Sequence, residues 1–272
     1  MTSIQKLQGS LLAITTLWKR ELVRFFRQKG RVVGALGTPV GFWILIGSGF
    51  GKSFRMPIST HANEINYLEY FFPGTITLII LFTSIFSTIS LIEDRKEGFL
   101  LSVLVAPVSR PTIVIGKILG GTTLAFFQAL AFVLLAPLIG IPLNGKQFAS
   151  MLGVLFLIAF ALTALGFAIA WKSESTQGFH AVMNLVLFPM WLLSGALFPI
   201  TGASSWLGWV MKLNPLTYGV SSLRHILYAG NPAVVDGLLP LSQSILITSF
   251  FGIIALVVAF ILASRKTNQG FS

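Results

Sequence analysis

The chain has 272 residues, of which 54% are hydrophobic and 10% are charged, and its mean hydropathy is +0.84. This balance excludes an ordinary water-soluble domain, because a soluble helix needs a polar outer face, and it favours a lipid bilayer as the solvent. The absence of cysteine excludes disulfides, thiol catalysis and thiolate metal sites, and the net charge of +11 lies mostly beside apolar runs, which indicates membrane topology rather than nucleic-acid binding.

The N-terminal part of the chain is expected to form an amphipathic helix over residues 11–31. Arginines recur there at helical spacing and apolar side chains occupy the other faces, so the helix should lie in the cytoplasmic headgroup layer. The residues that define this interface helix are Trp18, Arg20, Arg24, Phe25 and Arg27. The alternative is a positively charged flank with no further role. No cleavable signal peptide is expected, because the first apolar run starts only after this stretch.

Six apolar runs are long enough to cross the roughly 30 Å hydrocarbon core of a bilayer as helices. Each run is bounded by charged residues or by proline and glycine. The predicted spans are residues 32–50, 70–92, 118–141, 148–171, 179–200 and 241–263. The sequence therefore predicts an all-α membrane protein with a single transmembrane domain over residues 1–272.

The distribution of Lys and Arg predicts the orientation, because the cytoplasmic flanks of membrane helices carry an excess of positive charge. Most of the 19 Lys and Arg residues fall on the cytoplasmic side if the N-terminus lies there. An even number of spans then places the C-terminus on the same side. The expected location is the cytoplasmic (inner) membrane of a prokaryote, with several crossings, and the expected partners include the lipid bilayer but no nucleic acid.

The connection between the fifth and sixth spans, residues 201–240, is long and rich in Trp, Leu and Val. We expect short re-entrant helices here that dip into the outer leaflet. They should be broken at Asn214-Pro215 and at Asn231-Pro232, because the residue before a proline is biased away from helical backbone angles.

The connection between the second and third spans, residues 93–110, passes from dense charge to an apolar stretch and then to a basic end. Acidic residues at Glu93 to Glu97 can begin a short helix, because the positive end of a helix dipole favours them. Pro107 would end this helix and Arg110 would sit at the membrane edge. Such a helix suits docking into a groove on a soluble partner. A charged loop that only joins two spans explains the same residues equally well.

This connection resembles the coupling loop of type-2 ATP-binding-cassette (ABC) exporter permeases. The family pattern is an acidic-basic-acidic-Gly cluster, a leucine-rich turn and a Pro-Val-Ser-Arg ending. Matching residues are Asp94, Arg95, Glu97, Gly98, Leu100, Pro107, Val108, Ser109 and Arg110, directly after Glu93. Two positions depart from the pattern, Phe99 in place of a threonine and Leu101 in place of an acidic residue. The stretch from Asn214 to Gly219 is similar to drug-resistance and nodulation-factor export permeases.

The resemblance implies a permease subunit that is paired with a second one and served by two copies of a separate ABC ATPase. A homodimer is favoured for the permease pair, and a heterodimer is the alternative. ATP and Mg would bind the ATPase, and no cofactor is expected on this chain. The implied activity is ATP-driven export of an amphipathic, lipid-like or saccharide substrate. The second and fifth spans resemble pathway-lining helices of the family. Candidate pathway residues on them are Phe82, Phe86, Asn184 and Trp191.

The residues themselves show no enzymatic machinery. The stretch from Gly47 to Ser53 approaches a phosphate-binding loop, but position 46 is Ile where the motif needs Gly. No metal-binding or catalytic motif is present. The alternative function is a stand-alone secondary transporter or channel, which is less favoured because all eight carboxylates lie near predicted interfaces.

Two further features predict how the helices pack. Gln128 and Asn184 are polar residues inside spans and are expected to form interhelical hydrogen bonds. Glycine pairs at small-xxx-small spacing would allow close helix approach. These pairs are Gly30/Gly34, Gly37/Gly41 and Gly116/Gly120.

Overall fold

The computed structural model describes residues 3–50, 65–105, 108–229, 231–235 and 237–265, and these ranges contain helices and no strands. Six helical stretches are long and apolar enough to cross a membrane. They are Lys29–Phe50, Tyr67–Lys96, Arg110–Ile139, Gly145–Lys172, Thr176–Ala196 and Leu241–Ser264. The all-helical fold with six candidate spans is therefore confirmed.

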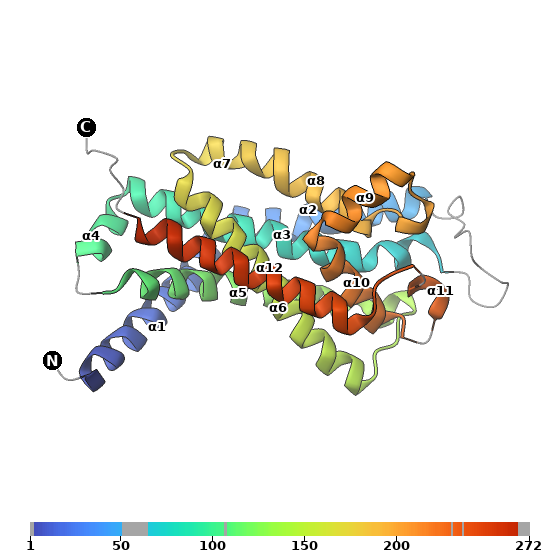
Figure 1. Ribbon diagram of the computed structural model, residues 1–272, viewed down its shortest axis with the longest axis horizontal. Coiled ribbons are helices and arrows are strands. Elements are labelled where there is room, and N and C mark those ends of the chain that lie inside the picture. The colour runs from blue at the N-terminus through green and yellow to red at the C-terminus, as the bar shows by residue number, and fades with distance from the viewer. Residues whose placement is uncertain (1–2, 51–64, 106–107, 230, 236, 266–272) are drawn as a thin grey trace.

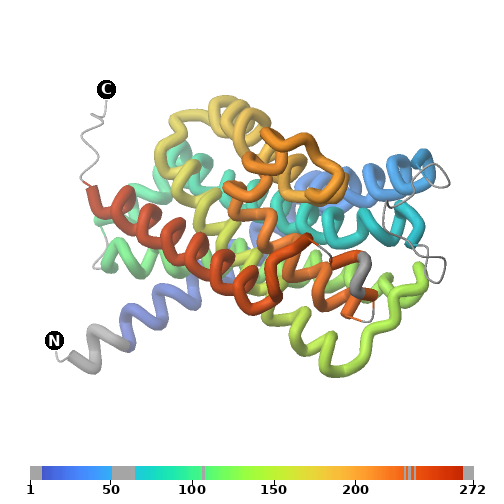
Figure 2. Tube along the Cα trace, turned by 45° about the vertical axis from the view of Figure 1, so that its right-hand side comes forward, coloured from blue at the N-terminus to red at the C-terminus, as the bar shows by residue number. Residues whose placement is uncertain are grey.

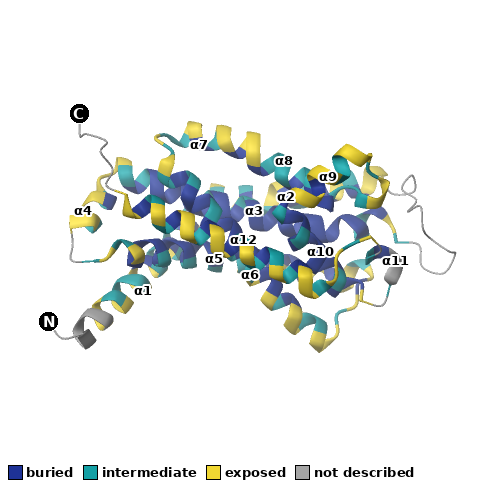
Figure 3. Ribbon diagram, viewed as in Figure 1, coloured by how far each residue is buried: buried dark blue, intermediate teal, exposed yellow. Residues whose placement is uncertain are grey.

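The bundle is built around α3 (Tyr67–Lys96), which is buried along most of its length (Figures 1 and 3). The helices packed against α3 include α2 (Lys29–Phe50), α5 (Arg110–Val133) and α6 (Gly145–Lys172). The last span, α12 (Leu241–Ser264), lies against α6. Because apolar side chains surround α3 on several sides, this helix carries little of the polar face that a surface helix would need.

The helices extend past the predicted bounds of the spans, most of all at the start of the third and at the end of the second. The third begins at Arg110 instead of residue 118, and the second continues to Lys96 instead of ending at residue 92. Charged residues suggested an exit from the membrane at these points. Asp94 and Lys117 instead continue their helices, because they pair with each other inside the protein.

The N-terminal helix α1 (Ser3–Arg27) lies against α5 with its second half, and its first half projects from the bundle (Figure 2). It ends before Gln28, so the expected helix over residues 11–31 is divided between α1 and α2.

Added Cβ atoms on Gly116 and Gly120 would lie 2.9 Å and 2.7 Å from the Cβ atoms of Leu17 and Glu21. The predicted close approach is therefore found at Gly116/Gly120. The other two glycine pairs meet no such contact.

The fifth span consists of α7 (Thr176–Val182), η3 (Met183–Leu187), α8 (Phe188–Trp191) and η4 (Leu192–Ala196). The connection to α12 contains η5 (Ile200–Gly202) and the short helices α9 (Ser205–Leu213), α10 (Pro215–Leu227) and α11 (Pro232–Val235). Short helices and a break at Asn214-Pro215 were expected here. Figure 1 places α9–α11 at one end of the bundle, called the far end below, and α4 (Phe99–Val105) at the other. After α5, η2 (Ala136–Ile139) leads into α6.

The contact between α1 and α5 gives a test of the packing. We expect Gly120→Ala to lower the melting temperature by roughly 2–8 °C relative to Gly153→Ala, since overpacking costs about 1–3 kcal/mol. Gly153 is the matched control, because a Cβ added there meets nothing within 4 Å. Thermal unfolding in detergent, followed by tryptophan fluorescence, measures the difference. Equal melting temperatures would contradict the close contact.

Candidate coupling site

The coupling segment, residues 93–110, begins inside α3. Glu93 to Lys96 form the last turn of α3, Glu97 caps it, and Gly98 turns the chain with a φ of 74°. The left-handed angle suits glycine, because other residues have a Cβ that clashes there. The expectation that a separate helix begins at Glu93 is therefore wrong. The short helix α4 begins at Phe99 and ends at Val105.

The apolar residues of α4 divide into two faces. Leu100 is buried against the bundle, while Leu101, Leu104 and Val105 are exposed, Val105 to 80%. An exposed apolar face on a short surface helix is a typical docking feature. Pro107 lies outside the described residues, and Ser109 is the N-cap residue of α5.

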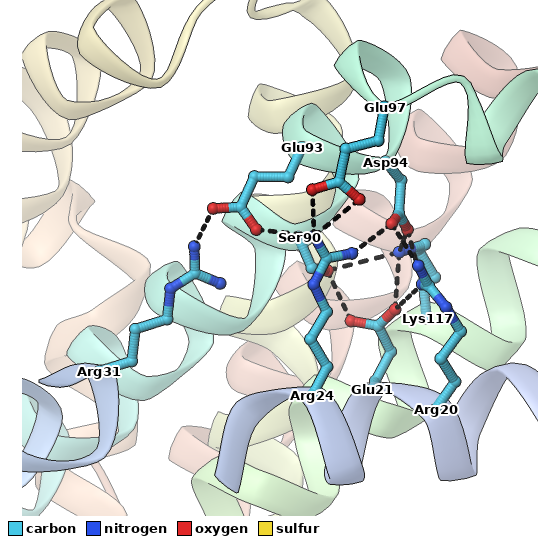
Figure 4. A network of polar contacts seen from close by, with 9 residues as sticks. All are labelled: Arg20, Glu21, Arg24, Arg31, Ser90, Glu93, Asp94, Glu97 and Lys117. Atoms are coloured by element: carbon cyan, nitrogen blue, oxygen red, sulfur yellow. Dashed lines mark hydrogen bonds and ion pairs between the residues drawn. The ribbon is translucent and has the colours of Figure 1, made fainter. Parts of the chain in front are cut away.

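The carboxylates of the coupling segment bind the basic residues of the first two helices (Figure 4). Glu93 forms ion pairs with Arg24 and Arg31, and Arg24 also reaches Glu97, which is 60% exposed. Asp94 forms ion pairs with Arg24 and, at 2.6 Å, with the Nη2 atom of Arg20. The arginines expected to face lipid headgroups are thus held partly by protein carboxylates.

A second, fully buried layer lies beneath these pairs. Lys117 of α5 is 4% exposed and pairs with Asp94 and, at 2.7 Å, with Glu21 of α1. The other Glu21 oxygen accepts a hydrogen bond of 2.5 Å from Ser90. Glu21 and Asp94, which were expected near the membrane interfaces, are therefore buried within the protein at this end of the bundle. A buried ion is tolerated only with compensating partners, so this layer fixes α1, α3 and α5 together.

The interface-helix residues contact several parts of the protein. Trp18 donates a hydrogen bond from Nε1 to the Thr123 hydroxyl at 3.0 Å, and Phe25 is buried. The guanidinium of Arg20 lies 3.7 Å from the ring centroid of Phe99 in α4. Burial lowers the pKa of Arg20, but the hydrogen bond to Asp94 and the attraction of that carboxylate more than offset this, so its pKa is raised above the usual value.

Arg27, the last interface-helix residue, is exposed and forms no ion pair with any other described residue. It lines an open groove of about 650 Å³ where the end of α1 meets the end of α3. The lining residues are Arg20, Val23, Arg24, Arg27, Gln28 and Glu97. The groove is therefore rich in guanidinium groups and suits an acidic or polar element of a partner.

Two arginines connect the coupling segment to the ends of other spans. Arg95 donates hydrogen bonds to the carbonyl oxygens of Trp171 and Ser173, at 2.7 Å and 2.9 Å, at the end of α6. Arg110 donates to the carbonyl of Ala263 at 2.9 Å and to the next two carbonyls, at the end of α12. Cations at a helix C-terminus satisfy carbonyls that have no partner within the helix.

The candidate pathway residues do not gather at one place. Phe82 and Phe86 are half-buried on α3, with ring centroids 6.0 Å apart. Trp191 is buried and donates from Nε1 to the Gly74 carbonyl at 2.8 Å. Asn184 is exposed on the fifth span.

The two polar residues expected to bond between helices differ in outcome. Gln128 accepts a hydrogen bond from the Thr83 hydroxyl at 2.5 Å and so links α5 to α3 as expected. No such bond involving Asn184 is found among the described residues.

Glu21, Ser90 and Lys117 belong to the site but were not among the candidates. The signal in the sequence is Lys117 at the start of a long apolar run, a pattern that also marks the edge of a membrane span.

The buried layer can be tested with Asp94→Asn. We expect it to cost about 3–5 kcal/mol of stability, because it leaves the buried Lys117 with one carboxylate fewer. The control is Glu97→Gln, which removes an exposed pair and should cost below about 1 kcal/mol. Denaturant unfolding in detergent measures both, and limited proteolysis reports release of α1. Equal effects of the two substitutions would exclude Asp94 as the stabilising centre.

Comparisons with known proteins agree with this architecture. A family model described as ABC-2 type transporter matches residues 13–228. The transport permease ycf38 of Cyanophora paradoxa is 30% identical over 212 residues, which cover 77% of this chain and 72% of that protein. The inner membrane transport permease YadH of Escherichia coli is 22% identical over 254 residues, which cover 92% of both chains. The family match includes the coupling segment and α10.

Proposed function

The chain belongs to the ABC-2 type transporter family of membrane permeases, whose membrane subunits lack the ATPase site, and from this premise we propose that it couples ATP hydrolysis on a separate ABC ATPase to outward transport. The substrate class we propose is amphipathic, lipid-like or saccharide. Its support is the similarity of the Asn214 to Gly219 stretch to drug-resistance and nodulation-factor export permeases. ATP and Mg would bind the two ATPase subunits.

One observation carries the proposal, namely the number of helices that the coupling segment joins. The segment continues α3, leads into α5, pairs with α1 through Asp94 and contacts the ends of α6 and α12 through Arg95 and Arg110. A force applied to α4 would therefore reach five helices at one end of the bundle. Such a junction suits the transmission of a partner's movement into the membrane.

The surface around α4 supports docking of an ATPase at this end. Val105 and its exposed neighbours offer an apolar face, and the groove beside Arg27 offers guanidinium groups. A soluble protein that buries the apolar face and pairs with the guanidinium groups would be held by both hydrophobic and charge-assisted contacts. The excess of Lys and Arg at this end supports its cytoplasmic location, with both termini on that side, in an inner membrane.

A second permease subunit, most simply another copy of this chain, follows from the position of α3. α3 fills the centre of the bundle, so the described helices of one copy pack around a buried helix and not around a channel. A translocation path would then run between two copies. Phe82, Phe86, Asn184 and Trp191 remain our candidates for residues near that path after a conformational change.

Docking can be tested by placing a charge on the exposed face of α4. We expect Val105→Asp to weaken binding of the ABC ATPase encoded beside this chain about tenfold or more, because it puts an ionised group into an apolar contact. Leu213→Asp is the matched control, since both side chains are 80% exposed and Leu213 lies in α9, at the opposite end of the bundle from α4. Co-purification and titration in nanodiscs measure the affinity. Equal affinity of the ATPase for both variants would contradict docking on the exposed face of α4.

Transmission can be tested separately with Arg95→Gln. We expect normal assembly and ATP hydrolysis but transport reduced about tenfold, since loss of a charge-assisted hydrogen bond is worth about 1.5–3 kcal/mol. Lys96→Gln is the control, because Lys96 is exposed and adjacent. The readout is the ratio of substrate moved to ATP hydrolysed in proteoliposomes. An unchanged ratio for Arg95→Gln would exclude its role in transmission.

A stand-alone secondary transporter or channel is the second candidate, and the buried carboxylates Glu21 and Asp94 favour it, since proton-driven carriers use such groups. Both carboxylates are paired with Lys117, which holds them as structural ions. Reconstitution of the chain without any ATPase separates the two functions. Flux driven by an ion gradient alone would overturn the ABC proposal.

A further inference from the structure

The fifth span is bent near the far end of the bundle. In η4, Leu193 and Gly195 leave helical backbone angles, and Gly195 has a φ of 78°. η3 and η4 also have π-helical hydrogen bonding, which occurs frequently at functional sites. Carbonyl groups at a helix bend or end need hydrogen-bond donors from elsewhere.

The N-cap residue of α10, Asn214, and a residue in its last turn, Arg224, supply two of these donors. The Nδ2 atom of Asn214 donates to the Met190 carbonyl at 2.5 Å, and the Nη2 atom of Arg224 donates to the Gly195 carbonyl at 2.6 Å. These contacts lie at opposite ends of α10, so the whole helix is attached along the bend. The bend is therefore fixed by α10 from one side.

The opposite side of the bend is held by α3. The Tyr67 hydroxyl donates to the Leu197 carbonyl at 3.0 Å, and Trp191 donates to the Gly74 carbonyl. A Cβ added to Gly74 would lie 2.7 Å from the Cβ atom of Ala196, so backbone and bend touch closely. The bent conformation is thus clamped between two helices.

The burial of Arg224 in this position costs folding free energy. Its side chain is 2% exposed, and its guanidinium lies 4.0 Å from the ring centroid of Tyr70. It forms no ion pair with a carboxylate among the described residues, and within those residues its buried Nε atom has no hydrogen-bond partner. A buried cation without a carboxylate partner costs stability, so its position beside the bend points to a role other than stabilising the fold.

We propose that Arg224 is a positioning residue of a gate at the far end, where its hydrogen bond to Gly195 latches the bent fifth span closed. Opening of that end would break this contact and let the fifth span move away from α3. The inference rests on the proposed transport function, because a latch is needed only where the far end opens.

A physical connection links the latch to the coupling segment. Arg110 holds one end of α12, and near the other end Ser244 lies 3.2 Å from Ser221 of α10, oxygen to oxygen. α10 packs along α12 and carries Arg224 one turn further on. A shift of α12 that begins at Arg110 would therefore move α10 relative to the bend.

The absence of cysteine makes a direct test possible. In nanodiscs, Ser194→Cys would place a single buried thiol within the bend, between Leu193 and Gly195. We expect slow maleimide labelling in the resting complex with the ABC ATPase and about tenfold faster labelling when Arg224→Gln is added, since loss of a charge-assisted bond shifts an opening equilibrium by that factor or more. Trapping with ATP and vanadate should accelerate labelling similarly without Arg224→Gln.

Three further variants sharpen the result. Lys212→Gln removes an exposed charge from the adjacent α9 and should leave labelling slow. Arg224→Lys keeps the charge and should restore part of the protection. Tyr70→Phe removes a hydroxyl that donates to Gly195 at 3.3 Å without changing any charge, so it should accelerate labelling even if Arg224→Gln fails to fold.

The outcomes separate the latch from the transport function. Slow labelling of both Arg224→Gln and Tyr70→Phe, or equal acceleration by Lys212→Gln, overturns the latch. Acceleration by Arg224→Gln without any effect of vanadate trapping supports the latch and counts against an ATP-driven transporter. Acceleration by vanadate trapping but by neither Arg224→Gln nor Tyr70→Phe supports an ATP-driven transporter and overturns the latch.

Discussion

The buried ion pairs of Lys117 with Asp94 and Glu21 constrain much of the rest of the structure. In the low dielectric of a helix bundle, none of these ions is stable without the others. α1 must therefore dock against α3 and α5, and the glycines at positions 116 and 120 allow it to come close enough. Once α1 is docked, Arg20 and Arg24 lie beside the end of α3. The position of the N-terminal helix and the shape of the coupling segment thus have one common cause.

The same end of the bundle joins elements that are far apart in the sequence. α1, α3, α5, α6 and α12 all reach the coupling segment, and polar contacts of arginine side chains make three of the five connections. Arginine suits this role because its planar group donates several hydrogen bonds in fixed directions while it keeps its charge. At the far end, Arg224 and Asn214 likewise donate hydrogen bonds to backbone carbonyls, those of the bent fifth span.

Composition and hydropathy were sufficient to predict an all-helical membrane protein with six spans, because the length of an apolar run is a direct consequence of bilayer thickness. The helices near Asp94 and Lys117 continue past the predicted ends of the spans for an equally physical reason. A charge in an apolar run signals a span edge only if it faces water, and the sequence does not show which distant residue will neutralise it. The family motif singles out Arg95 and Arg110 as candidate coupling residues. It does not show which groups they contact, because their acceptors are backbone carbonyls, which every residue type carries.

The exposed apolar face of α4 has a consequence for a copy of the chain that has not yet met its ATPase. Leu101, Leu104 and Val105 would then stand uncovered at the membrane surface. Chaperones and proteases recognise surfaces of this kind, so orphan subunits would be captured or degraded while assembled ones are spared. On the proposed function, seven residues of helix would serve both to engage the motor and to keep the numbers of the two subunits in balance.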